Sequence, residues 1–256
     1  MTIDGNVAVV TGAGSGIGAA SAERLAAEGA SVVCVDLHPA TAASTVEHLG
    51  GEAAGHRSVA GDVADVALWD EVVAVVAEAC GSARRLAVVH LNAGVYGWGG
   101  PIDELPEDLY RRTVGANIDG VVLGTRALVP VLRAGGGGAI VATASVAGLV
   151  AFPPNPIYTM TKHAVVGFVT ALAPNLATDG IVLSAVCPGI VDTPMTVEAL
   201  GGADPADLPM AVIAPADIAD AVVSLATGDE PGRCLAVGPG VRKAWVPRGF
   251  AELFSP

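Results

Sequence analysis

Positive charge is scarce in this chain of 256 residues, which has 13 Lys and Arg against 26 Asp and Glu and a formal net charge of −13. The sequence contains no run of basic residues, which argues against nucleic acid as a partner. The electrostatic field of a negatively charged protein also repels anions. Any phosphorylated ligand is therefore expected at a local site built from backbone N–H groups or a nearby cation.

Cysteine is sparse and scattered. Cys34, Cys80, Cys187 and Cys234 lie far apart, with no CxxC pair and no Cys/His cluster of metal-ligand spacing. This pattern predicts neither a zinc site nor a disulfide framework. We expect free thiols, no metal and a cytoplasmic location.

The sequence also lacks a stretch typical of a membrane span. The longest uncharged segment, 134–161, is interrupted by a block of four glycines and by three prolines. Asp4 and Gly5 break the pattern of a signal peptide almost at once. We therefore expect a soluble protein that does not interact with a membrane.

Short β-branched runs alternate with alanine-rich helical patterns along the chain, and 52% of the residues are hydrophobic. The pattern predicts strands at 7–11, 31–36, 55–59, 86–91, 139–143, 181–186 and 234–237, and helices at 17–28, 40–49, 65–79, 106–132, 157–176 and 215–226. This order is typical of βαβ units. The expected fold is a single α/β domain over 1–256, a doubly wound, Rossmann-like parallel sheet with helices on both faces. The Gly-, Pro- and Ala-rich segment 194–215 is expected to form a lid over a substrate pocket.

A glycine-rich turn, T-G-A-G-S-G-I-G from Thr11 to Gly18, joins the first predicted strand to the first predicted helix. Glycines let the backbone approach a pyrophosphate, and the helix N-terminus supplies N–H donors. The sequence therefore predicts a dinucleotide site that includes Gly12, Ser15, Gly16, Ile17 and Gly18.

Asp36 ends the second predicted strand, at the distance from the glycine turn that a dinucleotide site requires. Its carboxylate can accept hydrogen bonds from the adenosine ribose and would repel a 2′-phosphate. No Lys or Arg follows it directly, and His38 is the nearest partly basic residue. The predicted cofactor is therefore NAD rather than NADP.

Tyr158 and Lys162 lie four residues apart, thirteen residues after Ser145. On a helix this spacing puts both side chains on one face, and a nearby ammonium lowers the pKa of a phenol. Asn155 and Pro156 suit the start of such a helix, whose dipole adds to the effect. Taken alone, the pair also fits a surface tyrosine beside an unrelated lysine.

The TGxxxGxG spacing together with Ser145, Tyr158 and Lys162 resembles the short-chain dehydrogenase/reductase family. The resemblance covers almost the whole chain, in the right order, although Leu91 stands where the family often has Asn. Further positions that match the family's cofactor segments are Asp62, Val63, Asn92, Ala93, Gly94, Pro188, Gly189, Val191 and Thr193.

The resemblance implies roles for four residues. Tyr158 would be the general acid/base, Lys162 would lower its pKa and bind the nicotinamide ribose, and Ser145 would hydrogen-bond the substrate oxygen. Asn117 would hold a water that links Lys162 to solvent. The implied reaction is the interconversion of a secondary alcohol and a ketone with NAD. The alternatives are an NADP-preferring ketone or acyl reductase and a dinucleotide sensor without catalysis.

The substrate is expected to be neutral and fairly hydrophobic. The residues expected near it, besides Ser145 and Tyr158, are mostly apolar and lie near strand ends: Val95, Tyr96, Trp98, Ala147, Phe152 and Met195. Segments such as 162–168 and 187–189 are similar to the NAD-dependent hydroxyprostaglandin dehydrogenases, but they concern helix packing and imply no substrate.

The helix predicted after Tyr158 has apolar residues around nearly its whole circumference, among them Ala164, Val165, Phe168 and Leu172. Such a helix must be covered on more than one side. We therefore expect a homo-oligomer, a tetramer or dimer, although alanine and valine enrichment alone could also produce the pattern.

Overall fold

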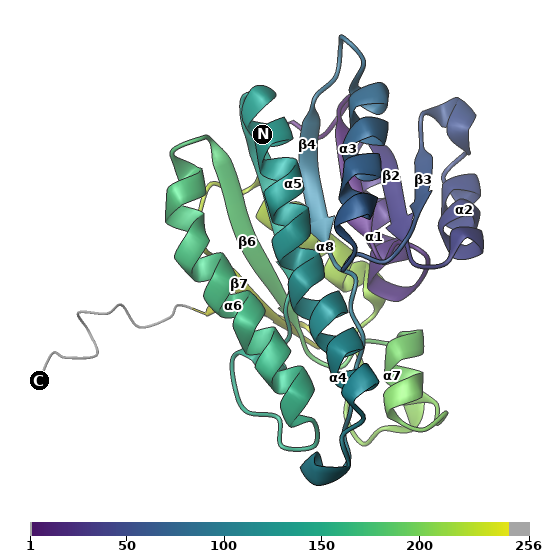
Figure 1. Ribbon diagram of the computed structural model, residues 1–256, viewed down its shortest axis with the longest axis vertical. Coiled ribbons are helices and arrows are strands. Elements are labelled where there is room, and N and C mark those ends of the chain that lie inside the picture. The colour runs from purple at the N-terminus through teal and green to yellow at the C-terminus, as the bar shows by residue number, and fades with distance from the viewer. Residues whose placement is uncertain (1, 246–256) are drawn as a thin grey trace, which may run out of the picture.

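The β-branched runs form one sheet in the computed structural model, which describes residues 2–245 (Figure 1). Within these residues the strand order is β3-β2-β1-β4-β5-β6-β7-β8, and all neighbours are parallel except β7 and β8. The strands are β1 Val7–Thr11, β2 Ser31–Asp36, β3 Arg57–Ala60, β4 Leu86–Leu91, β5 Gly138–Thr143, β6 Ile181–Pro188, β7 Cys234–Gly238 and β8 Val241–Trp245. Every residue of β1, β4 and β5 is buried, because helices cover both faces of a parallel sheet.

The helices lie in two layers. Those that pack on the face turned toward the viewer in Figure 1 are α3 Val66–Cys80, α5 Gly120–Ala134 and α6 Pro156–Ala177. Those on the opposite face are α1 Gly16–Ala27, α2 Pro39–His48 and α8 Pro215–Thr227. The short helices α4 Glu107–Val114 and α7 Pro194–Ala199 belong to segments that follow the carboxyl ends of β4 and β6. The prediction of a single doubly wound α/β domain is confirmed.

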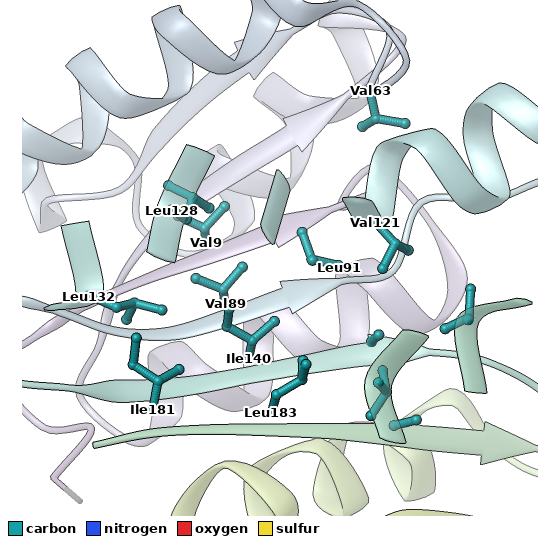
Figure 2. Packing of buried hydrophobic residues seen from close by; sticks show 14 of the residues in the cluster. Val9, Val63, Val89, Leu91, Val121, Leu128, Leu132, Ile140, Ile181 and Leu183 are labelled. Carbon is teal, nitrogen blue, oxygen red and sulfur yellow. The ribbon is translucent and has the colours of Figure 1, made fainter. Parts of the chain in front are cut away.

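The larger core cluster lies between the sheet and the layer of α3, α5 and α6. Figure 2 shows adjacent strands presenting a row of side chains on one face of the sheet, and the row comprises Val9, Val89, Ile140 and Leu183. Leu128 and Leu132 of α5 are fully buried against this cluster. Each such side chain contributes roughly 1.5–3 kcal/mol when it leaves water. This packing holds the strand ends, and the loops that follow them, in fixed positions.

Three elements differ from the sequence prediction, and the first is α7, a helix within the segment 194–215 for which only a lid was expected. β8 was not expected, because its exposed residues Arg242 and Lys243 give no apolar pattern, yet it pairs antiparallel with β7. The helix expected over 106–132 is broken by a π-helical turn, Gly115–Asp119, between α4 and α5.

The segment Glu107–Ala134 is the one helix among the described residues that is long and apolar enough to cross a membrane by length and composition. Thr113, Leu128 and Leu132 within it are buried in the fold.

Candidate active site

A cavity of about 490 Å³ opens at the carboxyl ends of the central strands. The strand order reverses there, because the chain runs outward from β1 to β2 and β3 on one side and from β4 to β7 on the other. Open α/β sheets bind their ligands at such a switch point. The predicted site residues are therefore expected on the walls of this cavity.

The backbone of the glycine-rich turn between β1 and α1 forms part of the cavity wall. A Cβ atom added to Gly18 would overlap the carbonyl oxygen of Gly12, and one added to Gly14 would lie 2.8 Å from Asp36 Oδ2. Within the described residues the N-cap side chain of Ser15 makes no capping hydrogen bond, so the first N–H groups of α1 remain available to an anion. The turn fits the pyrophosphate of a dinucleotide.

The Asp36 carboxylate lies beside this turn at the end of β2. Its Oδ2 accepts a hydrogen bond from the backbone N–H of Gly14 at 2.8 Å, and Oδ1 accepts from Thr41 Oγ1 and the N–H of His38, each at 3.0 Å. Apart from Lys162, the described residues that line the cavity include no Lys, Arg or His. A 2′-phosphate at Asp36 would meet a negative charge with no cation to offset it.

A chain of hydrogen bonds ties the ends of β1, β4 and β5 together beneath the cavity. The Thr11 hydroxyl accepts from the N–H groups of Asn92 and Ala93, and the Thr143 hydroxyl donates to Asn92 Oδ1 at 3.0 Å. Because its proton is used there, the Thr143 hydroxyl accepts from His90 Nε2 at 2.9 Å, which assigns the proton of His90 to Nε2. Burial lowers the pKa of His90 to about 3, so this ring is a neutral part of the core.

Ser145 lies directly after β5 on the far wall of the cavity. It caps a short 3-10 turn, and its Oγ accepts from the N–H of Ala147 at 3.1 Å and donates to the Pro188 carbonyl at 3.4 Å. One contact comes from the 3-10 turn Val146–Gly148 and the other from the end of β6. They leave the Ser145 hydroxyl buried but on the cavity wall.

Tyr158 and Lys162 reach the same wall from the first two turns of α6. The helix begins as the sequence predicts, with Asn155 accepting from the N–H of Tyr158 at 2.9 Å and Pro156 in the first position. Lys162 is buried, and its Nζ donates to the Thr143 carbonyl at 2.8 Å. The same Nζ lies 5.5 Å from the centre of the Tyr158 ring. The i, i+4 pair therefore does share one face, directed at the cavity.

Asn117 lies in the π-helical turn and is fully buried. Its Oδ1 accepts from the N–H of Val95 at 2.8 Å, while its Nδ2 donates to the Val95 carbonyl at 3.0 Å and to Thr161 Oγ1 at 3.0 Å. Asn117 thus connects the loop after β4 to α6. It stands behind the cavity wall rather than on it.

The sequence matches the family model described as short chain dehydrogenase over residues 6–202. The chain belongs to the short-chain dehydrogenase family. Membership makes the protein an NAD(P)-dependent oxidoreductase of the alcohol dehydrogenase and reductase type, as the sequence motifs indicated.

Two curated relatives of this dehydrogenase are similar over most of the chain. The 2-(R)-hydroxypropyl-CoM dehydrogenase of Xanthobacter autotrophicus is 37% identical over 232 residues, which cover 87% of this chain and 92% of the relative. The cyclohexanol dehydrogenase of an Acinetobacter species is 37% identical over 195 residues, 75% of each chain.

A solved structure supports the same conclusion about the fold. The 3-ketoacyl-(acyl-carrier-protein) reductase from Brucella melitensis, complexed with NADH, superposes with a TM-score of 0.83 at 30% identity. The match covers 92% of this chain and 97% of the reductase.

The expectation of a lowered Tyr158 pKa is wrong for the dehydrogenase in this structure. Burial raises the pKa of Tyr158 to about 12, and the Ser145 hydroxyl opposes the rise only in part. Burial also lowers the pKa of Lys162 to about 8, because it disfavours the ammonium. The sequence argument counted the ammonium but not the desolvation of both groups, which is the larger effect here.

Most of the predicted cofactor residues of the dehydrogenase line the cavity. They are Gly12, Ser15, Gly16, Ile17, Asp36, Asp62, Val63, Asn92, Ala93, Gly94, Tyr158, Lys162, Pro188, Gly189, Val191 and Thr193. Gly18 lies behind them, where its missing side chain admits the Gly12 carbonyl. The structure thus brings segments from β1 to β6 into one elongated site.

The predicted substrate residues Ala147, Phe152 and Met195 also line the cavity, but Trp98 does not. The Trp98 Nε1 donates to the Pro101 carbonyl at 2.9 Å, and its ring packs over Gly100, so the loop's own contacts hold it. The contact of Trp98 with the substrate stays a prediction.

Sequence reasoning missed several wall residues of the dehydrogenase. Tyr96, which was expected near the substrate, lines the cavity with its ring 5.6 Å from the Tyr158 ring, centre to centre. Val150, Ile190, Leu200 and Leu208 also line the cavity and were not expected there. Their position depends on how the loops fold over the strand ends. No local spacing in the sequence signals it.

Proposed function

We propose that this short-chain dehydrogenase interconverts a neutral secondary alcohol and its ketone with NAD as the cofactor. The observation that carries the proposal is that two groups of residues line one cavity. Ser145, Tyr158 and Lys162 form one group, and the glycine turn with Asp36 forms the other. A dinucleotide bound at this switch point of the sheet would bring its nicotinamide to the tyrosine.

Proton transfer falls to Tyr158 in this proposal. Its pKa, raised to about 12, keeps the phenol protonated at neutral pH, so that it can donate to the oxygen of a bound ketone. In the direction of oxidation it must accept the alcohol proton. A bound oxidised nicotinamide would supply the acceptor for the hydride, and its positive charge would favour the phenolate. Ser145 holds the substrate oxygen in place by a hydrogen bond.

Lys162 and Asn117 have supporting roles. The lowered pKa of Lys162, about 8, lets its ammonium exchange a proton near neutral pH. We propose that Lys162 binds the nicotinamide ribose and passes protons between Tyr158 and a water held near Asn117. The buried Asn117 also fixes Val95 next to this path, through hydrogen bonds to both the N–H and the carbonyl of that residue.

The preference for NAD rests on the Asp36 carboxylate. Exchange of Asp36 for Asn keeps an acceptor for the Gly14 N–H but removes the charge that repels a 2′-phosphate. We expect Asp36→Asn to lower the ratio of NADP to NAD dissociation constants by roughly tenfold or more, as loss of an unscreened like charge implies. Titration of protein fluorescence with each reduced cofactor measures the ratio.

Asp65→Asn is the matched control, because Asp65 carries the same charge at the N-cap of α3 and does not line the cavity. It should leave the ratio unchanged. Equal ratios for Asp36→Asn and the wild type would show that Asp36 does not select the cofactor.

The lining of the cavity supports a neutral, apolar substrate. The described lining residues include Val95, Phe152, Met195 and Leu208, and Lys162 is the one cation among them. We propose that segment 194–215, which contains α7 and contributes Met195 and Leu208 to the wall, acts as the lid. The similarity to hydroxyprostaglandin dehydrogenases stays a prediction and names no substrate.

A panel of secondary alcohols with NAD and with NADP tests the proposed reaction. With an alcohol such as cyclohexanol, the absorbance of the reduced nicotinamide is expected to rise with time. The rise is expected to be faster with NAD than with NADP. Turnover with NADP alone would favour the reductase alternative. Cofactor binding without turnover on any alcohol or ketone would favour a dinucleotide sensor.

We also propose a homo-oligomer, located in the cytoplasm. Most of the exposed residues of α6 are small or apolar, among them Met160, Gly167 and Ala171, although His163 and Asn175 are exposed as well. Ala171→Arg would place a charge in this interface and should dissociate the oligomer. The mass of the particle in solution should then fall to half of the wild-type value or less. Sedimentation velocity measures this, and a wild-type particle of 25.3 kDa, the mass of one chain, would contradict the proposal.

A further inference from the structure

The side chain of Asn155 is fully buried at the point where α6 meets the loop after β4. We propose that Asn155 is a positioning residue, which holds the Tyr96 loop against Tyr158 and so sets the width of the reaction site. The inference rests on the proposed alcohol oxidation. Asn155 does not line the cavity, so its effect must pass through the two tyrosines.

One end of the Asn155 amide fixes the catalytic helix. Oδ1 accepts from the N–H of Tyr158 at 2.9 Å, and the Asn155 carbonyl accepts from the N–H of Thr159 at 3.0 Å. These bonds satisfy donors of the first turn of α6, which would otherwise have no partner in a buried place. They fix the position of the Tyr158 backbone.

The other end of the amide fixes the loop. Nδ2 donates to the carbonyl of Tyr96 at 2.7 Å, fifty-nine residues away in the sequence. The preceding residue, Val95, is held at both its N–H and its carbonyl by Asn117. Two buried asparagines from two different helical segments therefore fasten consecutive residues of the loop.

The fastened loop presents the Tyr96 ring to the reaction site. The ring lines the cavity and lies 5.6 Å from the Tyr158 ring at an angle of 36°. Any shift of the Tyr96 backbone would move this ring relative to the phenol that transfers the proton. The Asn155–Tyr96 hydrogen bond therefore sets the gap between the two rings.

The double contact requires an amide. A helix cap alone could be Ser, Thr or Asp, each of which supplies an acceptor. Asp has no donor for the Tyr96 carbonyl, and the Ser hydroxyl is too short to span both partners. Only the amide of Asn offers an acceptor and a donor at this distance, and the two partners together fix which end is oxygen.

Comparison of Asn155→Ser and of Asn155→Asp with the wild type separates the loop contact from the cap. Both variants keep an acceptor for the Tyr158 N–H, and both lose the donor to Tyr96. Loss of this hydrogen bond is expected to lower kcat roughly tenfold, while the NAD dissociation constant stays within about twofold of wild type. The ratio of kcat/KM for cyclohexanol to that for 2-propanol is expected to change as well, because the Tyr96 wall is released.

Asn175→Ser is the matched control, since Asn175 lies exposed near the other end of α6. It should match the wild type in every measurement. Wild-type kcat and an unchanged ratio in Asn155→Ser and Asn155→Asp would overturn the inference, as would loss of NAD binding in both variants, which would mark a purely structural role. Inactivity of the wild type and the control on all alcohols would instead count against the proposed function.

Discussion

Tyr158→Phe is expected to abolish alcohol oxidation while NAD still binds. The exchange removes one hydroxyl at the cavity wall and keeps the ring that packs beside Tyr96. Loss of a positioned general acid/base typically lowers turnover by about 10²–10⁴-fold. The measurement is kcat with the best alcohol of the panel, together with the NAD dissociation constant by fluorescence titration.

Tyr110→Phe provides the control for this result. Tyr110 lies on α4, is 37% exposed and does not line the cavity, so loss of its hydroxyl should leave kcat unchanged. If Tyr158→Phe also retained turnover near the wild-type level, another group would have to transfer the proton, and the assignment of Tyr158 would fail.

Gly18→Ala adds a single methyl group, which is expected to disrupt the cofactor site. The new Cβ would overlap the backbone oxygen of Gly12 and lie 2.9 Å from Asn92 Nδ2, so the turn between β1 and α1 must move. Because backbone atoms cannot move aside as a flexible side chain does, we expect the free energy of unfolding to fall by about 2–4 kcal/mol. NAD binding should weaken by about a hundredfold or more, because the N–H groups of α1 leave their positions.

The same substitution at Gly238, where a Cβ meets nothing within 4 Å, is the control and should leave both quantities near wild type. Thermal unfolding and NAD titration measure the two effects. A Gly18→Ala protein that binds NAD as the wild type does would show that the turn is not the cofactor cradle.

The sequence predicted the interior of the fold well for a physical reason. Strands such as β1 and β4 are buried on both faces, so hydrophobic burial alone marks them as continuous apolar runs. β8 lies at the sheet edge with exposed polar residues, and nothing in its composition separates it from a loop. The π-helical turn Gly115–Asp119 escaped prediction because it shifts hydrogen bonds within a helix without changing the apolar pattern.

The site divides in the same way. The i, i+4 spacing of Tyr158 and Lys162 and the pattern of the glycine turn are local signals in the sequence. The structure confirms that these residues line one cavity. Contacts between distant segments were missed, notably Asn155 with Tyr96 and Lys162 with the Thr143 carbonyl. Desolvation was missed too, which is why the pKa of Tyr158 is raised rather than lowered. Both depend on which segments fold over the strand ends, and local spacing does not encode that.

Direct transfer of hydride from the alcohol carbon is the central claim, and isotope labelling tests it most directly. The best alcohol of the panel, deuterated at the carbon that bears the hydroxyl, is incubated with NAD and the wild-type protein. Mass spectrometry should find the reduced cofactor one deuterium heavier and the product to be the ketone. Reduced cofactor without deuterium, or no reduction with any secondary alcohol, would contradict the account.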